Sequence, residues 1–473
     1  MKVYNTLSRS KEEFVPLTPG EVRMYVCGVT PYDFSHIGHA RSAIAFDVIR
    51  RYLRFKGFRV TFVKNYTDVD DRIIRRANER GVEAREVSEQ YIAEDQKDMA
   101  SLGIVPPDVA PKATEHIPEM LRLIEALVAG GFAYVVDGDV YFEVRRFPAY
   151  GKLSGKNLEE LLAGARVEVD ERKRDPRDFA LWKGAKPGEP AWASPWGPGR
   201  PGWHIECSAM AMKYLGESFD VHGGGEDLIF PHHECEIAQA EAVTRRTFAR
   251  YWLYNGFVNM GAEKMSKSLG NTLNIRDLVQ RHDPEALRLF LIGTHYRSPV
   301  EFTDEGVRER ARALERLRRM PLEAARLGAS GAGGPDGGLP ATLATARAAF
   351  AVAMDDDFNT PQALGVLFDL SRTLYAYADL VGRGERAVQP FVEGVSVLVA
   401  LANALGLLER TPAGAEGPAD VRARVGTLVR ERDQARKRRD FTRGDALRAE
   451  IDRLGWSVED TPSGPRIAPK TGG

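Results

Sequence analysis

Residues 23–42, RMYVCGVTPYDFSHIGHARS, join an apolar run to the start of a helical pattern through a Gly/Pro turn. The run at 23–29 has the length of a buried strand. From Ser35 the apolar spacing, closed by Gly57, predicts a helix. The next segment, RVTFVKNYTDVDD at 59–71, predicts a second strand that ends in polar residues. This order indicates a right-handed crossover in a parallel sheet, in which ligands bind at the carboxyl ends of the strands.

The composition indicates an ordinary globular protein of two to four domains. The chain has 473 residues, which exceeds the size at which a single hydrophobic core keeps growing. Apolar residues make up 43%, charged residues 28%, and the formal net charge is −1, so charge says nothing about partners. The cysteines, Cys27, Cys207 and Cys235, are odd in number and far apart. They disfavour a disulfide framework and leave metal binding or burial as alternatives.

We expect a cytoplasmic protein without a membrane segment. The first residues, MKVYNTLSRSKEEF, lack the apolar core of a signal peptide. No run of about 18 apolar residues, the length that a membrane-spanning helix needs, occurs in the sequence.

An insertion is predicted to divide the α/β unit. AYVVDGDVYFEV at 133–144 places a DG turn between two β-rich runs, which predicts a hairpin. Region 178–201 is rich in Trp, Pro and Gly, and strand and helix patterns resume after it. Beyond Asp283 the pattern is helical. Gly/Pro/Ala-rich segments at 328–340 and 411–419 are expected to be loops or linkers.

Two histidines lie where the first helix is predicted to begin. His36 and His39 flank Ile37 and Gly38. A helix N-terminus offers free N–H groups and a partial positive charge, and a glycine lets a phosphate or adenine approach the backbone closely. Imidazoles placed there can donate hydrogen bonds to phosphoryl oxygens. Taken alone, two histidines in one turn are more often a cap and a surface residue, so this alternative stays open.

A polar loop flanked by glycines, GAEKMSKSLGN at 261–271, contains Lys264 and Lys267. Such a loop can fold over a triphosphate, where its ammonium groups neutralise charge on the leaving pyrophosphate. Alone, two lysines three apart are usually only solvated charge. The sequence contains no G-x-G-x-x-G after the first strand and no P-loop motif, so dinucleotide and P-loop interpretations lose their main support.

Together the two motifs resemble the HIGH and KMSKS signatures of class I aminoacyl-tRNA synthetases. Further stretches between residues 24 and 361 narrow the resemblance to the cysteinyl-tRNA synthetase family. They are MYVCGVTPYDFSHIGHAR, NYTDVDDRIIRRA, DFALWK, PGWHIECSAM, HGGGEDLIFPHHECEIAQ, KMSKSLGN and DDDFNTP.

The resemblance implies an α/β fold: a catalytic domain with a split, Rossmann-like parallel sheet and an insertion, then an α-helical bundle and a small C-terminal anticodon-binding domain. The segmentation along the chain has the same order. The expected limits are 1–125 and 196–255 for the two halves of the catalytic domain, 126–195 for the connecting insertion, 256–308 for the KMSKS-loop connecting domain, 309–410 for the bundle and 420–473 for the anticodon-binding domain.

The implied activity is that of a ligase, which activates L-cysteine with ATP to cysteinyl-adenylate and transfers it to tRNA(Cys). We expect Mg²⁺ to accompany ATP and the chain to be a monomer. No side-chain nucleophile is needed, because catalysis depends on positioning and charge neutralisation. The expected catalytic residues are His36, His39, Lys264 and Lys267, and the expected ATP contacts are His36, Gly38, His39 and Lys267.

The resemblance also implies one zinc ion. The matching ligand positions are Cys27, Cys207, His232 and Glu236. His232 and Glu236 are four apart and share a helix face, whereas His233, Glu234 and Cys235 are expected to point elsewhere. Thiolate, imidazole and carboxylate are suitable zinc ligands, although the cysteine spacing alone would not reveal a site. Zinc favours a thiolate and would reject serine, for which shape supplies only about 1–3 kcal/mol.

By the same resemblance, the amino acid and the adenosine are bound by a set of pocket residues. They are Cys27, Gly28, Thr67, Trp203, His222, Gly224 and Asp227. For Trp203 the alternative is core packing, and for HGGGED at 222–227 it is a plain turn. Cys235 and Glu226 depart from the family's usual residues, and neither stands at a ligand position.

The remaining charged segments are assigned structural or RNA-binding roles. The acidic runs at 68–71 and 355–357 are predicted to lie at helix ends and on the surface. The tail from Val421 has an excess of Lys and Arg, including Arg436–Arg439, and is predicted to contact tRNA rather than form a plain solvated helix. Trp456 is expected to pack in a small core, with base stacking as the alternative.

Two rival functions stay open. A cysteine ligase that couples activated cysteine to an amino sugar would share the zinc site and both signatures. DFALWK, DDDFNTP and the basic tail favour the tRNA enzyme. A non-enzymatic RNA-binding module would account for the tail, but not for the metal ligands and phosphate-binding loops.

Overall fold

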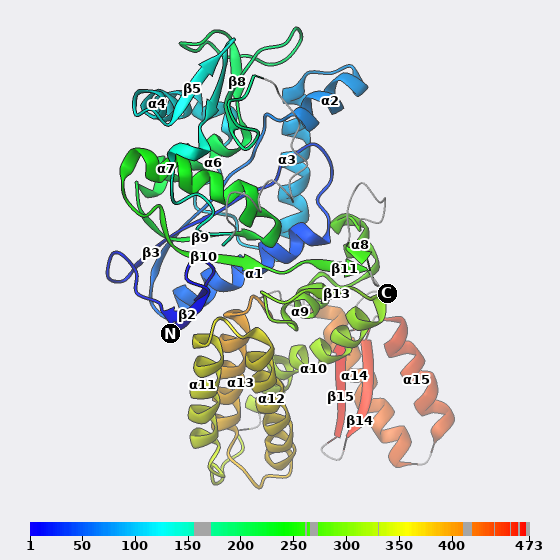
Figure 1. The fold of residues 1–473 in the computed structure, drawn as a ribbon. Coiled ribbons are helices and arrows are strands. Elements are labelled where there is room, and N and C mark those ends of the chain that lie inside the picture. The colour runs from blue at the N-terminus through cyan, green and yellow to red at the C-terminus, as the bar shows by residue number, and fades with distance from the viewer. Residues whose placement is uncertain are drawn as a thin grey trace. The chain divides into compact units, whose positions relative to one another are not determined.

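The structure is a computed structural model. It describes residues 1–155, 172–260, 263–264, 273–329, 331–409, 419–438, 440–454, 456–461 and 464–469. The chain divides into two compact units, Met1–Arg308 with Ala353–Pro361, and Glu309–Val352 with Gln362–Gly473. The first unit contains the parallel sheet, and helices dominate the second (Figure 1).

A four-stranded parallel sheet forms the centre of the first unit. Its strands, in the order β10-β9-β3-β4, are β3 (Glu21–Val26), β4 (Arg59–Lys64), β9 (Phe219–Gly225) and β10 (Ala249–Asn255). Helix α1 (Ile37–Phe55) connects β3 to β4, which confirms the predicted crossover. The parallel sheet also confirms the predicted α/β fold class.

The carboxyl ends of β3 and β9 meet at the point where the chain reverses its direction across the sheet. From β3 the chain passes to β4 on one side, and later returns to the other side with β9. Crevices at such switch points bind ligands in open α/β sheets. Cys27 directly follows β3, and its N–H donates to the carbonyl of Gly223 at 3.2 Å. The end of the predicted first strand therefore lies in this crevice.

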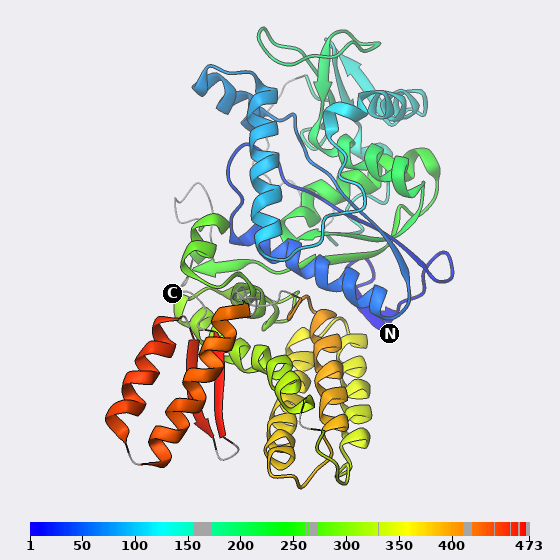
Figure 2. The same ribbon diagram turned by 180° about the vertical axis from the view of Figure 1, so that it is seen from behind.

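Helices cover both faces of the sheet. Helix α1 crosses one face, and α6 (Trp203–Leu215) and α7 (Glu234–Thr244) lie on the other (Figures 1 and 2). The core beneath α6 and α7 includes Tyr25 and Trp252 from the strands, with α4 (Ile117–Ala129) packed against the same helices. Apolar burial of this kind fixes the helices that carry the candidate ligands.

The insertion is an antiparallel sheet in the order β5-β6-β7-β8. Its strands are β5 (Ala133–Val136), β6 (Asp139–Phe142), β7 (Phe179–Gly184) and β8 (Gly199–Pro201). Asp137 and Gly138, between β5 and β6, have φ values of 50° and 86°. Two positive φ values are what a two-residue hairpin turn requires, so the hairpin predicted from the DG pair is confirmed.

The other elements of the first unit are short strands and helices around the sheet. They are β1 (Lys2–Asn5), β2 (Ser10–Glu13), α2 (Asp71–Arg80), α3 (Ala84–Ser101), β11 (Val258–Met260), β12 (Glu263–Lys264), α8 (Ile275–Arg281), α9 (Pro284–Ile292) and β13 (Val300–Glu301), with 3-10 turns at Ala113–His116, Val144–Arg146 and Glu226–Leu228 and a kinked turn, η4, at Ile229–His233.

The prediction that both acidic runs lie at helix ends and on the surface is wrong for Asp68 and Asp357. Asp68 is buried and accepts hydrogen bonds from the N–H and hydroxyl of Thr114 at 2.9 and 2.5 Å. Asp357 is fully buried and accepts from the Tyr296 hydroxyl at 2.9 Å and from Arg297 Nε at 2.7 Å. Each carboxylate is buried because it satisfies donors from a distant segment, which spacing along the sequence does not reveal.

In the second unit, long helices form a bundle. They are α10 (Asp304–Gly328, which begins in the first unit), α11 (Leu339–Asp355), α12 (Thr360–Gly382) and α13 (Val388–Asn403). Their buried side chains include Phe350, Leu367 and Phe391.

A smaller module follows the bundle. It contains α14 (Ala419–Lys437), α15 (Phe441–Arg453), β14 (Trp456–Thr461) and β15 (Gly464–Pro469). Its own core includes Val425, Leu447, Ile451 and Trp456. Core packing, the expected role of Trp456, is confirmed.

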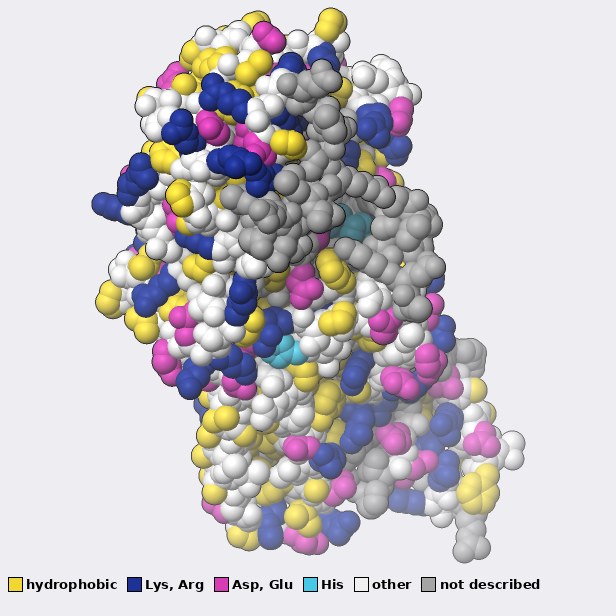
Figure 3. Space-filling view, viewed as in Figure 1, with side chains coloured by type: hydrophobic (Ala, Val, Ile, Leu, Met, Phe, Trp, Pro, Cys, Tyr) yellow, Lys and Arg dark blue, Asp and Glu magenta, His cyan; other side chains and the backbone are white. Residues whose placement is uncertain are grey.

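Positive and negative side chains are interspersed over the face seen in Figure 3, as expected for a net charge of −1. Within the described ranges, no helix combines the length and the apolar character that a membrane crossing needs.

Candidate active site and metal centre

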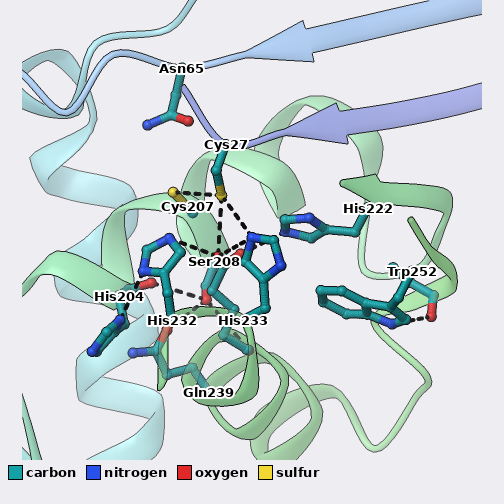
Figure 4. Close-up of polar contacts among 12 residues, drawn as sticks. Cys27, Asn65, His204, Cys207, Ser208, His222, His232, His233, Gln239 and Trp252 are labelled. Carbon is teal, nitrogen blue, oxygen red and sulfur yellow. Dashed lines mark hydrogen bonds and ion pairs between the residues drawn. The ribbon is translucent and has the colours of Figure 1, made fainter. Parts of the chain in front are cut away.

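Four side chains that were predicted as metal ligands lie together at the switch point. Cys27 Sγ is 3.7 Å from Cys207 Sγ and 3.5 Å from Glu236 Oε1. His232 Nε2 is 3.0 Å from the same Glu236 oxygen. One ligand atom from each of the four lies within 4.8 Å of the others. Figure 4 shows the two thiols side by side, facing the histidines.

Three elements bring these residues together. Cys27 follows β3, Cys207 lies in the second turn of α6, and His232 and Glu236 flank the start of α7. At Gly28 an added Cβ would lie 1.5 Å from the carbonyl oxygen of Asn65, so only glycine permits the chain to turn there. The Gly28 N–H donates to Asn65 Oδ1 at 2.9 Å, which holds the turn that places Cys27.

The expectation that His233 points away from the cluster is wrong. His233 Nε2 is 3.2 Å from Cys27 Sγ, and its Nδ1 is 2.7 Å from the Tyr254 hydroxyl. His232 and His233 stand four and three residues before Glu236, at the end of the kinked turn η4, so both rings lie on the same side of the chain as the Glu236 carboxylate. Their ring centroids are 5.5 Å apart, and both rings reach the cluster.

Glu234 and Cys235 do point elsewhere, as expected. Cys235 Sγ is 3.2 Å from the Tyr150 hydroxyl, and Glu234 accepts the N–H of Ser154 at 2.8 Å.

His233 creates a second group of potential ligands, namely Cys27, His222, His233 and Glu236. In this group His222 Nε2 is 2.8 Å from Glu236 Oε2, and its ring stacks on Trp252 with centroids 4.5 Å apart. A thiol-rich set suits zinc better than one with a single thiol and two imidazoles, because thiolates are the softer donors. The set with both cysteines is therefore favoured, and His222 orients the Glu236 carboxylate.

The electrostatics of the cluster favour a bound cation. Burial opposes ionisation of Cys207, but the hydrogen bond from Cys27 and the charge of His232 lower the pKa of Cys207 to about 6. Burial likewise opposes protonation of His232, but Glu236 and Cys207 raise the pKa of His232 to about 10. A thiolate and a carboxylate thus share a buried site with one imidazolium. Buried anions need compensating positive charge, so this donor set fits a divalent metal ion.

Two neighbours position His232. His204 Nδ1 lies 2.9 Å from His232 Nδ1, and burial lowers the pKa of His204 well below its usual value, so neutral His204 accepts the His232 Nδ1 proton. A bond of this kind directs the other ring nitrogen toward a metal. Trp203 stacks on His232 with centroids 4.2 Å apart and is 36% exposed, so Trp203 is not a core residue.

A pocket of about 390 Å³ opens beside the cluster, and we call it the signature pocket. Its predicted lining residues are Cys27, Gly28, His36, Gly38, His39, Trp203 and Asp227. Sequence analysis did not assign four further lining residues: Tyr32 and Arg72, which stand within the quoted stretches, and Lys64 and Asn255, which stand outside them.

Three predicted substrate contacts lie outside the described lining of this pocket. Thr67 is buried, with its hydroxyl 3.4 Å from Asn65 Nδ2. His222 is buried against Glu236. Gly224 lies behind the cluster, where an added Cβ would be 3.2 Å from His233 Cε1.

The two signature histidines have a defined tautomer. His36 Nδ1 accepts the Gly38 N–H at 3.1 Å, and His39 Nδ1 accepts the His36 N–H at 3.2 Å. Their rings stack with centroids 3.8 Å apart. Because both Nδ1 atoms are acceptors, each neutral ring carries its proton on Nε2. His36 thus caps α1, one of the two alternatives, and the Nε2–H of either ring is a donor of the kind that a phosphate accepts.

Backbone hydrogen bonds tie both ends of the second signature segment to the site. The Ile37 N–H donates to Leu273 O at 2.9 Å, and the Ile275 N–H donates to Ser35 O at 3.0 Å. At the other end β12, which contains Lys264, pairs with β11. The backbone of Lys264 is therefore held opposite Asn259 of β11, while Lys267 lies outside the described residues.

Arg41 is a further residue that sequence analysis missed. It follows the first signature in α1 and is buried. Its guanidinium donates to a series of backbone carbonyls after α9, including His295 O at 2.7 Å and Ser298 O at 3.2 Å. Burial lowers the pKa of Arg41 to about 10, which still leaves it charged. Arg41 thus fixes α1 to the segment that follows the second signature.

Comparison with known proteins agrees with this geometry. Residues 13–312 match the family of class I tRNA synthetase (C) catalytic domains, and residues 349–409 match the DALR domain. The cysteine–tRNA ligase of Syntrophobacter fumaroxidans is 52% identical over 98% of this chain and 99% of its own. That of Geobacter sulfurreducens is 53% identical over 98% of each. The chain belongs to the cysteine–tRNA ligase family.

Solved structures with the same fold include more distant synthetases. Mycobacterium tuberculosis methionyl-tRNA synthetase in complex with methionyl-adenylate has a TM-score of 0.60 at 16% identity, over 81% of this chain and 89% of that one. LeuRS of Agrobacterium radiobacter K84, in a ternary complex with tRNA and LeuAMS, has a TM-score of 0.61 at 12% identity, over 83% and 85%. The chain therefore shares its fold with class I synthetases outside the cysteine–tRNA ligase family.

Proposed function

We propose that the chain activates L-cysteine with ATP and transfers the cysteinyl group to tRNA(Cys). The observation that carries the proposal is the cluster of Cys27, Cys207, His232 and Glu236, which adjoins a pocket that also contains His36 and His39. One end of the pocket can recognise a thiol, and the other can hold phosphates. Relatives about 50% identical over nearly the whole chain are cysteine–tRNA ligases, which favours this function over amino-sugar ligation.

Zinc would be held by Cys27, Cys207, His232 and Glu236, and when bound it would favour the thiolate of the substrate over a hydroxyl. Cys27 is the ligand that also lines the signature pocket, so the substrate side chain would enter from that direction. Trp203 lies over His232 at the same end and limits the space beside the thiol. Asp227, at the pocket wall, would accept a hydrogen bond from a hydroxyl or ammonium group.

In the first step the cysteine carboxylate attacks the α-phosphorus of ATP, and pyrophosphate leaves. His36 and His39 donate hydrogen bonds from Nε2–H to phosphoryl oxygens, and Lys264 and Lys267 neutralise charge on the leaving group. Mg²⁺ would accompany the ATP phosphates. In the second step a terminal ribose hydroxyl of tRNA attacks the acyl carbon, and AMP leaves. The chain positions the reactants and supplies no nucleophile.

Cysteine-dependent exchange of pyrophosphate into ATP, followed by charging of tRNA(Cys), tests the proposal. Exchange together with charging is the expected result. Exchange without charging, and with cysteine coupled to an amino sugar, would identify the rival ligase. We also propose a monomer that works in the cytoplasm, which gel filtration and cell fractionation can check.

The replacement Lys267→Ala is expected to slow adenylate formation by roughly 10²-fold or more, the usual effect of removing one electrostatic donor from a transition state. ATP affinity should change much less, because the charge on the β-phosphate develops only as the bond breaks. Single-turnover kinetics of adenylate formation separate the two quantities. Lys97→Ala, an exposed lysine paired with Glu94 on α3, is the matched control. A large loss of ATP affinity at unchanged rate would assign Lys267 a ground-state role instead.

A further inference from the structure

The signature pocket contains a cation that neither signature supplies. Lys64 is the last residue of β4, and it lines the pocket together with residues from the first turns of α1. In the register of the sheet it stands opposite Val26, the residue before Cys27. Lys64 therefore lies at the carboxyl end of a parallel strand, next to the switch point at which ligands bind.

The side chain of Lys64 lies on the face of the sheet that α1 covers. Phe62, two residues earlier in β4, contacts Arg50 of α1, whose guanidinium carbon is 5.3 Å from the centroid of the phenyl ring. Alternate residues of a strand share a face, so Lys64 points to the same side as Phe62. There the lining of the pocket comes from the first turns of α1, including His39. The ammonium group thus faces the space beside the first signature.

The ammonium group of Lys64 has no direct partner within the described chain. No hydrogen bond or ion pair joins it to another described residue. The charge of Asp95 acts on it, but both Asp95 oxygens already accept hydroxyl groups, from Ser35 at 2.6 Å and from Tyr66 at 3.1 Å. Burial lowers the pKa of Lys64, and Asp95 offsets this effect only in part. A half-buried cation without a partner is costly, so the site favours an added anion.

Arg72, which also lines the signature pocket, differs from Lys64 in this respect. Its Nε atom is 3.0 Å from Asp70, and its guanidinium carbon lies 5.1 Å from the centroid of the Tyr32 ring. A carboxylate therefore already compensates the charge of Arg72. Within the described lining, an anionic ligand gains most from Lys64.

The two faces of the sheet separate the thiol end of the substrate from its reacting end. Cys207 lies on α6 and Glu236 on α7, and both helices cover the face opposite α1 (Figures 1 and 2). Lys64 lies on the α1 side, where the phosphates of ATP are proposed to lie beside His36 and His39. An ammonium group on that side is suited to a phosphate and not to the thiol.

We propose that Lys64 is a further catalytic residue for cysteine activation, and that its ammonium group donates hydrogen bonds to the α-phosphate oxygens of ATP. This inference rests on the proposed function. When the cysteine carboxylate forms its bond to the α-phosphorus and the bond to pyrophosphate breaks, two anionic groups must meet. A fixed ammonium group compensates their charge, and Lys64 transfers no proton.

Two matched pairs of ligands test which anion Lys64 binds. AMP and adenosine differ by the α-phosphate, and cysteine and cysteamine differ by the carboxylate. Calorimetric titration of the zinc-loaded chain and its variants gives the dissociation constants. Lys64→Met should lower the preference for AMP over adenosine about tenfold, the usual effect of one charge-assisted hydrogen bond, and leave the preference for cysteine over cysteamine unchanged. Lys64→Arg, which keeps the charge, should retain most of the preference for AMP.

Single-turnover kinetics supply the second readout. Lys64→Met should slow adenylate formation by roughly 10²-fold, and Lys64→Arg should restore most of the rate. A merely structural role would weaken AMP and adenosine alike, so it would not change their ratio. Lys64→Gln is a second neutral variant, which keeps the test decisive if Lys64→Met does not fold.

Lys56→Met is the matched control. Lys56 is exposed at the other end of α1, where it pairs with Asp355 at 3.0 Å, and it does not line the described pocket. This change should leave both preferences and the rate unchanged. A full preference for AMP in both neutral variants of Lys64 would overturn the proposal. A lowered preference for cysteine over cysteamine would also overturn it, because Lys64 would then bind the carboxylate. Failure of the proposed function looks different, because then the unchanged chain shows neither cysteine-dependent exchange nor charging.

Discussion

The replacement Cys207→Ser is expected to lower the preference for cysteine over serine from roughly 10⁴ to roughly 10² in pyrophosphate exchange. A site that bonds the polar group of its substrate rejects an analogue strongly, whereas shape alone distinguishes near-isosteres poorly. Cys207 is buried and 3.7 Å from Cys27, so we expect it to act on the substrate through a bound metal and not by contact. Most of the loss should appear as weaker activation of cysteine.

Zinc content provides a readout that does not depend on activity. Cys207→Ser should lower the zinc affinity by more than the roughly 10–100-fold typical of changes in hydrogen-bond partners of ligands. His233→Gln distinguishes the two possible ligand sets, because only the second set contains His233. Zinc retained by Cys207→Ser but lost from His233→Gln would assign the metal to the second set and contradict our choice.

Cys235→Ser is the matched cysteine control. Its sulfur contacts the Tyr150 hydroxyl, a contact that a serine hydroxyl can replace, so zinc content and exchange should stay nearly unchanged.

The sequence was sufficient to predict the crossover, the hairpin and the meeting of the four ligand candidates, because each depends on a local pattern or a family motif. The crossover was predicted from local properties of the chain, namely the length of the strands, the apolar spacing of the helix and Gly57 at the end of that helix. The DG pair at 137–138 needs only positive φ at two residues. His232 and Glu236 are four residues apart, and their side chains meet although His232 lies in η4 and Glu236 in α7.

The remaining features depend on contacts between distant segments. His233 faces the cluster because it stands three residues before Glu236, after a kink at which Phe230 has extended backbone, and no apolar period signals such a kink. The burial of Asp357 depends on Tyr296 and Arg297, about 60 residues earlier in the chain. Likewise, the sequence gives no sign that Arg41 differs from the other charged residues of α1. Its guanidinium nevertheless donates hydrogen bonds to backbone carbonyls about 250 residues away. These roles depend on which distant residues meet in the folded chain. The spacing of residues along the sequence does not reveal those contacts.

Removal of residues 419–473 is expected to lower the efficiency of tRNA charging by roughly 10²–10⁴-fold while cysteine-dependent pyrophosphate exchange stays nearly intact. The removed module has a core of its own, and Arg432 pairs with Asp460 through two hydrogen bonds of 2.7 Å inside it. Arg432 is therefore structural and is not a candidate tRNA contact. The cluster and the signature pocket belong to the first unit, so we expect activation not to need the module.

A double replacement in the full chain separates loss of contacts from loss of the module. Lys437 and Arg438 are exposed at the end of α14, and Lys437 forms an ion pair with half-buried Asp433 at 2.8 Å, a surface pair of small energy. Lys437→Ala with Arg438→Ala should weaken tRNA binding and lower the slope of log Kd against log salt by roughly 0.7–0.9 for each lost phosphate contact. Lys97→Ala, on α3, should leave that slope unchanged. If the truncated chain charges tRNA as well as the whole chain, with the same salt slope, the module does not bind tRNA and recognition must lie in the bundle or at the acceptor end.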